Sequence, residues 1–501
     1  MIDLYITTSI PYVNGAPHLG HALEFVHVDV LARQRAATGA AVRVQSGTDD
    51  HAIKNVSAAA DAGLPITELV KRNADRFTGL ADALAVRTDE FLRTSSDPRH
   101  RAGVAAIWAA CERHGDLYRK DYTGLYCTGC EQFYTPGDLT DGACAEHSAT
   151  HITEVTETNW FFRLSAYRQQ ITDLIRTGRL EITPAERRNE ILGFLASDLH
   201  DLSVSRPSGR AAGWGVPVPA DPGQVVYVWF DALANYLTGL GYGTRDDGDY
   251  RRWWSDPVER THVVGKGIVR FHAVYWVAFL LSAGLPLPTR ILVHDYLTVD
   301  GSKIAKSGAH ATDPAVLVEE FGQDAVRWWL LRDPARVGTT DFTIERLITA
   351  YNRDLANTVG NLTSRAVTLA RRPAVWRTAA AEILGHELLT EAADLPDLVA
   401  AALTRYDLRS ACQAVVALAA SANRFIEAEA PWHLAKAADT GDEQAAQRFE
   451  AVIETVLSVC STLAHELEPF IPAGSQRLRD QLTRQERRPA AAFPRLLEQP
   501  L

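Results

Sequence analysis

The segment "TTSIPYVNGAPHLGHALEFVHVDVLARQ", residues 7–34, contains the pattern that indicates the fold class. An apolar run that begins at residue 4 leads into it, and after a turn-rich segment the pattern predicts an amphipathic helix from about 18 to 37. A second apolar run, "AVRVQS" (41–46), follows that helix and reads as a buried strand. Strand, helix and strand in this order predict a βαβ unit, and therefore a parallel sheet.

Two histidines lie where the first predicted strand passes into the helix. His18 and His21 flank Gly20 in "HLGH". Backbone N–H groups at the start of a helix favour anions, and two imidazoles would add donors for phosphate oxygens. Gly20 has no side chain, so a nucleotide can approach the backbone closely. The pattern predicts a phosphate site; the alternative interpretation is that both histidines cap the helix or lie on the surface.

A pair of lysines on a glycine-flanked loop is the second phosphate-binding candidate. Lys303 and Lys306 lie in "VDGSKIAKSGA" (299–309), in a chain that has only seven lysines. Two ammonium groups can neutralise the charge that builds on a departing pyrophosphate. The alternative interpretation is a solvated basic loop.

The cysteines indicate a metal site. Six cysteines in 501 residues do not make a disulfide scaffold, but three of them fall between residues 127 and 144. Cys127 and Cys130 form one CxxC pair, and Cys144 and His147 form a second pair with the same spacing. Three thiolates and an imidazole predict one tetrahedral, structural Zn²⁺ per chain, with His151 as the alternative fourth ligand.

Length, charge and composition exclude several classes of protein. A chain of 501 residues is too long for one core, and its net charge of −11 argues against broad, non-specific binding to nucleic acid. The sequence has no apolar stretch long enough to cross a membrane and begins without a signal-peptide pattern. We therefore expect a cytoplasmic enzyme with no membrane partner, and we expect it to be a monomer.

Several sequence blocks resemble one enzyme family. "HLGH" and "KIAKS" resemble the HIGH and KMSKS signatures of class I aminoacyl-tRNA synthetases. The blocks that are similar to methionyl-tRNA synthetases, in that family's order, are "IPYVNGAPHLGH", "SGTDDH", "YVWFDALANY", "GKGIVRFHAVYW" and "DLANTVGNLTSR". The resemblance extends from residue 4 to about 470. It implies an enzyme that activates L-methionine with ATP and Mg²⁺, and transfers it to the 3′-terminal adenosine of tRNA(Met).

The resemblance also implies an organisation into domains. The expected fold class is α/β: a doubly wound, Rossmann-type parallel sheet with a zinc-knuckle insertion, followed by an all-α helical bundle that binds the anticodon. The predicted parts are the first catalytic half (1–114), the connective insertion with the zinc knuckle (115–224), the second catalytic half (225–285), a linker carrying the lysine loop (286–345) and the anticodon-binding helices (346–501). The residue pattern itself predicts short strands and turns over 115–165, a connector over 213–224, and, from 225, a strand and helix that continue the same doubly wound sheet.

By the same resemblance, roles are assigned residue by residue. His18, His21, Lys303 and Lys306 are expected to be catalytic, with Gly20 and Ser307 also at the ATP phosphates. Asp49 is expected to hold the α-ammonium of methionine. The residues expected to line the pocket for the methionine side chain are Ile10, Tyr12, Trp229, Ala232, Leu233, Tyr236 and His272. The Tyr236 hydroxyl and the His272 imidazole are expected to donate hydrogen bonds to the thioether sulfur, which is a weak acceptor. The alternative interpretation is that the aromatic residues are ordinary core.

The anticodon readers are expected on the C-terminal helices. Asn357, Asn361 and Arg365 recur at i, i+4 and i+8, on one helix face, and Asn423, Arg424 and Trp432 follow later. Amides and a guanidinium can bond the edges of splayed bases, and an indole can stack on one. The alternative interpretation is that the asparagines are buried amides that pack helices together.

Two other functions compete with the ligase. Ala305 replaces the serine of the lysine signature, so one hydroxyl is lost while both lysines remain. That change favours a biosynthetic paralogue, which would adenylate an amino acid and pass it to a small amine or hydroxylamine. A non-catalytic tRNA-binding or regulatory protein is the third candidate. The intact pocket, histidines, lysines and anticodon residues favour the ligase.

Overall fold

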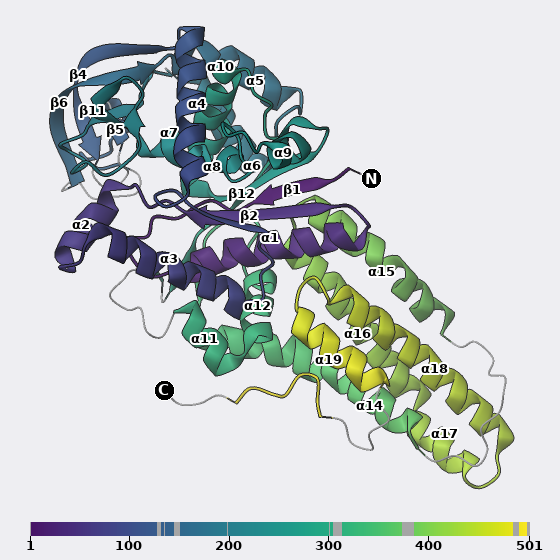
Figure 1. Ribbon diagram of the computed structural model, residues 1–501. Coiled ribbons are helices and arrows are strands. Elements are labelled where there is room, and N and C mark those ends of the chain that lie inside the picture. The colour runs from purple at the N-terminus through teal and green to yellow at the C-terminus, as the bar shows by residue number, and fades with distance from the viewer. Residues whose placement is uncertain are drawn as a thin grey trace. The chain divides into compact units, whose positions relative to one another are not determined.

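The computed structural model describes residues 2–127, 132–134, 136–144, 151–197, 199–299, 301–303, 313–372, 385–483 and 490–497. The chain forms two compact units (Figure 1). The first unit contains Met1–Val28, Arg35–Asp82 and Val86–Tyr296; the second contains Asp29–Gln34, Ala83–Ala85 and Leu297–Leu501.

A six-stranded sheet forms the centre of the first unit. Its order is β3-β2-β1-β12-β13-β7, and every neighbouring pair is parallel. The strands are β1 (Leu4–Thr7), β2 (Val42–Thr48), β3 (Glu90–Arg93), β7 (Glu181–Thr183), β12 (Glu259–Gly265) and β13 (Arg290–His294). Because parallel strands are covered on both faces, they read as short apolar runs, as β1 does. The predicted parallel α/β fold is confirmed.

Helices cover both faces of this sheet. Figure 1 shows α1 (Leu19–Ala37) and α4 (Pro98–His114) on opposite sides of β1 and β2. Helix α4 packs against α10 (Val277–Ala283), and an aromatic core fills the space beside them. The rings of Phe230 and Phe279 lie 4.5 Å apart, and Trp108 meets Phe230 edge-on at 5.5 Å.

The second half of the sheet differs from the predicted pattern. The apolar run at 225 does form a strand, β11 (Asp221–Val226), but that strand pairs antiparallel in a small three-stranded sheet with β9 (Ser205–Pro207) and β10 (Pro217–Val218). The segment 213–224, expected to be a connector, therefore contributes to a sheet. The parallel sheet resumes at β12, and β13 extends it beyond residue 285, the predicted end of this half. A short apolar run cannot by itself tell a parallel-sheet strand from one in a small antiparallel sheet.

The inserted lobe is built on one long hairpin-like pair. Strands β4 (Leu117–Cys127) and β6 (Ile152–Phe162) run antiparallel over their full lengths. Two short strands, β5 (Gln132–Tyr134) and β8 (Leu202–Ser203), extend the sheet at its edges. The strand-rich character predicted for residues 115–165 is thus observed.

The second unit is mainly helical, as predicted for the C-terminal part. A small sheet of β14 (Leu297–Val299), β15 (Ser302–Lys303) and β16 (Thr340–Phe342) also belongs to this unit. The helices are α11 (Pro314–Phe321), α12 (Gln323–Arg332), α13 (Ile344–Ala350), the π-helix η8 (Tyr351–Gly360), α14 (Asn361–Ala370), α15 (His386–Thr404), α16 (Leu408–Glu429), α17 (Pro431–Ala438), α18 (Glu443–Glu466) and α19 (Pro472–Thr483). Helices α16 and α18 lie side by side in Figure 1.

A buried charge pair anchors this unit. Arg327 on α12 is fully buried and lies 2.7 Å from Asp29. Its remaining donors bond the backbone carbonyls of Leu84, Pro469 and Phe470, so the guanidinium is held from several directions.

Within the described parts of the chain, no helix combines the length and the apolar character needed to cross a membrane.

Candidate active site

The candidate active site lies at the carboxyl ends of the central strands of the first unit. Strands β1 and β12 are neighbours, and the strand order reverses between them. In doubly wound sheets, ligands bind outside the carboxyl ends of the strands at this reversal. His18 follows β1, and Asp49 follows β2 directly. His272 lies in a short π-helix, η6 (Phe271–Trp276), shortly after β12. The topology therefore brings three distant blocks of sequence to one edge of the sheet.

The two histidines of "HLGH" form a reciprocal cap at the start of α1. The Nδ1 atom of His18 accepts the N–H of Gly20, and Nδ1 of His21 accepts the N–H of His18, each at 3.1 Å. Their rings stack with centroids 3.7 Å apart. Burial, together with the neighbouring His18, holds the pKa of His21 well below its usual value, so that ring is neutral. Since a backbone N–H occupies its Nδ1, the proton of neutral His21 is on Nε2, which makes Nε2–H a donor.

Gly20 leaves room for the His18 ring of this cap. A Cβ on residue 20 would lie 3.0 Å from Cε1 of His18, closer than side chains normally pack. The capping alternative raised by the sequence is therefore correct as far as it goes. It does not exclude phosphate binding, because capping uses only the Nδ1 atoms.

The predicted walls of the amino-acid slot gather in the same unit. Trp229 stacks on Phe271 with centroids 3.7 Å apart, and Tyr12 and His272 lie 6.3 and 6.4 Å from Trp229. Residue 12 also bridges Asp49 as an isolated parallel pair. The remaining wall residues are Ile10, half-buried beside Gly47, and Ala232, Leu233 and Tyr236, which are buried.

Tyr236 and His272 bond each other at 2.7 Å. Burial lowers the pKa of His272 to about 4 and raises that of Tyr236, so both are neutral at pH 7. Nδ1 of His272 lies 2.9 Å from the carbonyl of Ile268 and must donate to it. Nε2 is then an acceptor, and the Tyr236 hydroxyl donates to it. Both protons are committed within the protein, so in this arrangement neither group donates to sulfur.

Asp49 is positioned by the turn that it begins. Its side chain is buried, and Oδ1 accepts the N–H of His51 at 3.1 Å. Asn55 donates to the carbonyls of Asp49 and Asp50, at 3.0 and 2.8 Å, which fixes the same turn from below. Lys54 lies 5.3 Å above the Tyr12 ring and places a positive charge at this edge. A buried carboxylate of this kind suits an ammonium ligand.

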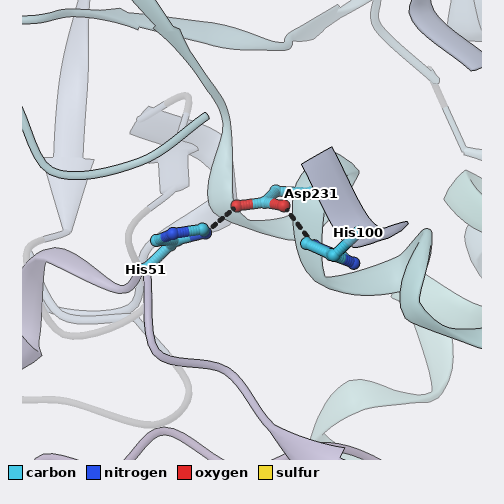
Figure 2. Close-up of side chains that lie close together, drawn as sticks. All are labelled: His51, His100 and Asp231. Carbon is cyan, nitrogen blue, oxygen red and sulfur yellow. Dashed lines mark hydrogen bonds and ion pairs between the residues drawn. The ribbon is translucent and has the colours of Figure 1, made fainter. Parts of the chain in front are cut away.

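A second carboxylate lies between two imidazoles next to this turn. Figure 2 shows Asp231 with His51 on one side and His100 on the other. Oδ2 accepts from Nδ1 of His51 at 2.7 Å, and Oδ1 accepts from Nε2 of His100 at 2.6 Å. Burial alone would lower the pKa of His51, but the adjacent Asp231 carboxylate outweighs it and the pKa is raised. Burial opposes ionisation of Asp231 as well, yet the two imidazoles hold its pKa well below the usual value.

These three side chains have the composition of a metal site, with ligand atoms within 4.8 Å of one another. Their geometry fits hydrogen bonds better. Each carboxylate oxygen accepts a hydrogen bond from a different imidazole, and the two imidazoles lie on opposite sides of the carboxylate. A metal ion would require the three ligand atoms to point toward one common position. We therefore assign a His–Asp–His hydrogen-bond relay.

The lysine loop belongs to the second unit and is only partly described. Lys303 lies in β15, opposite Thr298 of β14, while Lys306 and Ser307 lie outside the described residues. The turn before β15 is fixed by Asp341, whose Oδ1 accepts from the Thr298 hydroxyl at 2.7 Å and from the N–H of Gly301 at 2.8 Å. These hydrogen bonds lower the pKa of Asp341.

Half of the predicted zinc site is described. Cys127 and Cys144 are buried with their sulfur atoms 3.6 Å apart. Two thiolates bound tetrahedrally at about 2.3 Å from one zinc ion would be about 3.8 Å apart, whereas a disulfide requires about 2.05 Å. The pair therefore fits the metal. Cys130 and His147 lie outside the described residues, and His151, the alternative ligand, is exposed.

The predicted anticodon residues lie on neighbouring helices of the second unit. Asn357 and Asn361 are exposed, which argues against the alternative of buried packing amides, although the π-helix η8 changes the spacing between them. Arg365 lies 5.3 Å over the Trp432 ring and pairs with Glu427 at 2.7 Å. The other two differ. Arg424 is exposed, whereas Asn423 is half-buried and donates to the carbonyls of Thr358 and Ala419 at 3.1 and 2.9 Å, so Asn423 also packs helices.

Sequence reasoning missed several polar residues of the first unit. Glu24 on α1 accepts from Ser9 and lies 2.9 Å from Nε2 of His294 at the end of β13. The relay of His51, Asp231 and His100 was also missed. Its signal was present: Asp231 interrupts the apolar run "YVWFDALANY", and a charge inside such a run needs a buried partner.

Comparison with known proteins gives consistent results. The model of class I tRNA synthetases of the methionine type, "tRNA synthetases class I (M)", matches residues 4–151 and 134–367. The model described as "Anticodon binding domain of methionyl tRNA ligase" matches residues 377–499.

Curated relatives and solved structures agree over nearly the whole chain. The methionine–tRNA ligase of Mycobacterium bovis is 36% identical over 96% of this chain and 92% of its own length. That of Brucella suis is 37% identical over 95% and 91%. The structure of Mycobacterium tuberculosis methionyl-tRNA synthetase in complex with methionyl-adenylate superposes with a TM-score of 0.91 at 35% identity, covering 99% of this chain and all of that one. Its apo form gives a TM-score of 0.84 at 32% identity, covering all of this chain and 99% of that one.

Proposed function

Because this chain belongs to the methionyl-tRNA synthetase family of class I tRNA synthetases, we propose that it is a methionine–tRNA ligase. The observation that carries the proposal is the gathering of the family's amino-acid and histidine blocks at the strand-order reversal of one parallel sheet. Its partners are ATP, L-methionine and tRNA(Met), and it acts in the cytoplasm, where translation takes place.

The first step joins methionine to AMP. A carboxylate oxygen of methionine attacks the α-phosphorus of ATP, and the bond to the β-phosphate breaks to release pyrophosphate. His18 and His21 donate to the phosphates, and Gly20 lets the nucleotide approach the start of α1. Lys303, Lys306 and Ser307 bind the phosphates as well, and Mg²⁺ arrives as part of the ATP substrate. The enzyme's contribution is positioning and electrostatics.

The slot holds methionine by its two ends. Asp49 takes the α-ammonium, and the thioether enters between Ile10, Tyr12, Trp229 and His272, with Ala232, Leu233 and Tyr236 completing the wall. Because the Tyr236 hydroxyl and His272 bond each other, the slot selects methionine by shape and by contact with a polarisable sulfur. This replaces the expectation that these two groups donate hydrogen bonds to sulfur.

In the second step the 2′-hydroxyl of the terminal adenosine attacks the methionyl carbonyl carbon, and AMP leaves. The C-terminal helices choose the tRNA: Asn357, Asn361, Arg365, Asn423, Arg424 and Trp432 read and stack the anticodon bases. Zn²⁺ held by Cys127, Cys130, Cys144 and His147 would be structural, since four protein ligands leave no open position. We expect the enzyme to act as a monomer.

One assay sequence tests this function. Pyrophosphate exchange is measured with each amino acid, and charging of purified tRNA(Met) follows. We expect exchange with methionine and charging of tRNA(Met). Exchange without charging would indicate the biosynthetic paralogue, and absence of exchange would indicate a binding protein.

A further inference from the structure

The His51–Asp231–His100 relay connects the two ends of the proposed methionine site. Asp231 lies on the short helix α7 (Val228–Leu233), which also carries the slot residues Trp229, Ala232 and Leu233. Residues three and four apart share a helix face, so Trp229 lies with Ala232 and Leu233, while Asp231 faces away from them. Trp229 stacks on Phe271, whereas Asp231 meets the two imidazoles. One helix thus has a slot face and a relay face.

The relay face of α7 reaches the turn of the ammonium-binding carboxylate. Nδ1 of His51 donates to Oδ2 of Asp231 at 2.7 Å, and the backbone N–H of His51 donates to Oδ1 of Asp49 at 3.1 Å. The path from α7 to Asp49 therefore passes through a single residue. The Trp214 ring packs edge-on to His51 at 5.7 Å, and its Nε1 donates to the carbonyl of Asp50 at 2.7 Å, which closes the turn from the other side.

His100 fixes the other oxygen of Asp231. It lies on α4, is fully buried, and its Nδ1 is 2.8 Å from the Thr238 hydroxyl on α8 (Asn235–Thr238). A carboxylate held on both oxygens cannot rotate, so the orientation of His51 is set by the surrounding helices. Charge-assisted bonds of this kind are about twice as strong as neutral ones.

We propose that Asp231 is a positioning residue for methionine: through His51 it holds the Asp49 turn at a fixed distance from the Trp229 face of the same helix. It thereby matches the separation of the ammonium site and the thioether slot to the length of the substrate. The proposal rests on the proposed role of Asp49 as the ammonium ligand. It assigns no chemical step to Asp231.

The test compares two ligands that differ only at the ammonium group. Binding of L-methionine and of 4-(methylthio)butanoate, which lacks the α-amino group, is measured by calorimetry for the full chain and for Asp231→Asn. We expect Asp231→Asn to weaken the binding of methionine by about tenfold or more, which corresponds to one charge-assisted hydrogen bond. The affinity for 4-(methylthio)butanoate should stay within about twofold of the wild-type value. Equal weakening of both ligands, or of neither, would overturn the proposal.

Two further arms separate this proposal from the function on which it rests. Asp49→Asn must itself discriminate between the two ligands; if it does not, the ammonium role of Asp49 fails. If Asp49→Asn discriminates and Asp231→Asn does not, only the positioning role fails. In the double variant Asp231→Asn should add little to Asp49→Asn, because both act on one contact.

Asp116→Asn is the matched control. Asp116 is another buried carboxylate with a histidine partner, 2.8 Å from Nδ1 of His114, and it also bonds Ser282 and Tyr167 away from the slot. It should leave the ratio of the two affinities unchanged. Should Asp231→Asn fail to fold, His51→Asn and His51→Ala replace it. Asparagine keeps a donor at the position of Nδ1, so His51→Asn should retain methionine affinity that His51→Ala loses; equal losses would refute the role.

Discussion

The imidazoles of His18 and His21 stack with their ring centroids 3.7 Å apart, and each accepts a backbone N–H through Nδ1. Two positively charged rings would repel each other at this distance, in agreement with the lowered pKa of His21. The pair is therefore a cap of α1 in which His21 is neutral and its Nε2–H is left for donation. The same side chain can therefore cap the helix and bind phosphate, because the cap uses Nδ1 and phosphate binding would use Nε2–H.

Replacing His21 by asparagine separates those functions. The asparagine oxygen can still accept the N–H of His18, so we expect the free energy of unfolding to change by less than about 1 kcal/mol. The donor at the position of Nε2 is lost, and the adenylation rate should fall by about 10²- to 10³-fold. Pyrophosphate exchange and thermal unfolding measure the two effects. A His21→Asn enzyme with the wild-type rate would show that His21 is only a cap.

Replacing Tyr236 by phenylalanine tests how the slot selects its substrate. The change leaves the buried Nε2 of His272 without its donor, at a cost of about 1–3 kcal/mol in stability. Since the hydroxyl proton is committed to His272, the ratio of kcat/KM for methionine to that for norleucine should stay within about threefold of wild type, as methionine and norleucine differ little in shape. Pyrophosphate exchange with both amino acids measures that ratio. A large fall in discrimination would mean that the hydroxyl does donate to sulfur.

The sequence predicted the parallel fold better than its details, for physical reasons. The helix after β1 was predictable because apolar spacing, a cap and a flanking strand all agree over one short stretch. The run at 225 was misplaced because local pattern does not say which sheet a strand joins. The relay was missed because His100 and Asp231 are separated by 131 residues in the chain, and only the fold brings their side chains together.

Replacing Cys144 by serine tests the metal site. We expect zinc content to fall well below one ion per chain, since a hydroxyl is a poor zinc ligand. The inserted lobe should lose stability, because structural zinc contributes folding free energy directly. Zinc is measured by atomic emission, and unfolding by calorimetry. Cys460→Ser is the control: this buried cysteine lies on α18, and its variant should keep zinc even where it unfolds more easily. Full zinc content in Cys144→Ser would remove this residue from the ligand set.

Replacing Trp432 by alanine tests the anticodon surface. The indole packs under the Arg365 guanidinium at 5.3 Å, and a stacked base is worth about 1–3 kcal/mol. We expect kcat/KM for charging tRNA(Met) to fall by about 10- to 100-fold while methionine-dependent pyrophosphate exchange is unchanged. Leu398→Ala, a change of an exposed residue on α15, should affect neither rate. Equal losses in both assays would indicate damage to the fold instead of loss of tRNA contact.

The buried imidazole of His272 should make stability depend on pH. Its pKa is about 4 in the folded chain, against a usual value of 6.5, so the folded state binds its proton later than the unfolded state as pH falls. Stability is therefore complete above about pH 6.5 and is lost between that pH and about pH 4, by up to about 3 kcal/mol at 1.4 kcal/mol per pH unit. His262, whose pKa burial also lowers, acts in the same direction. Denaturant unfolding at pH 7.5 and pH 4.5 should show a smaller difference for His272→Gln than for the wild-type chain. An unchanged difference would mean that His272 is already protonated in the folded slot, which would also reverse the assignment of the Tyr236 hydroxyl as donor.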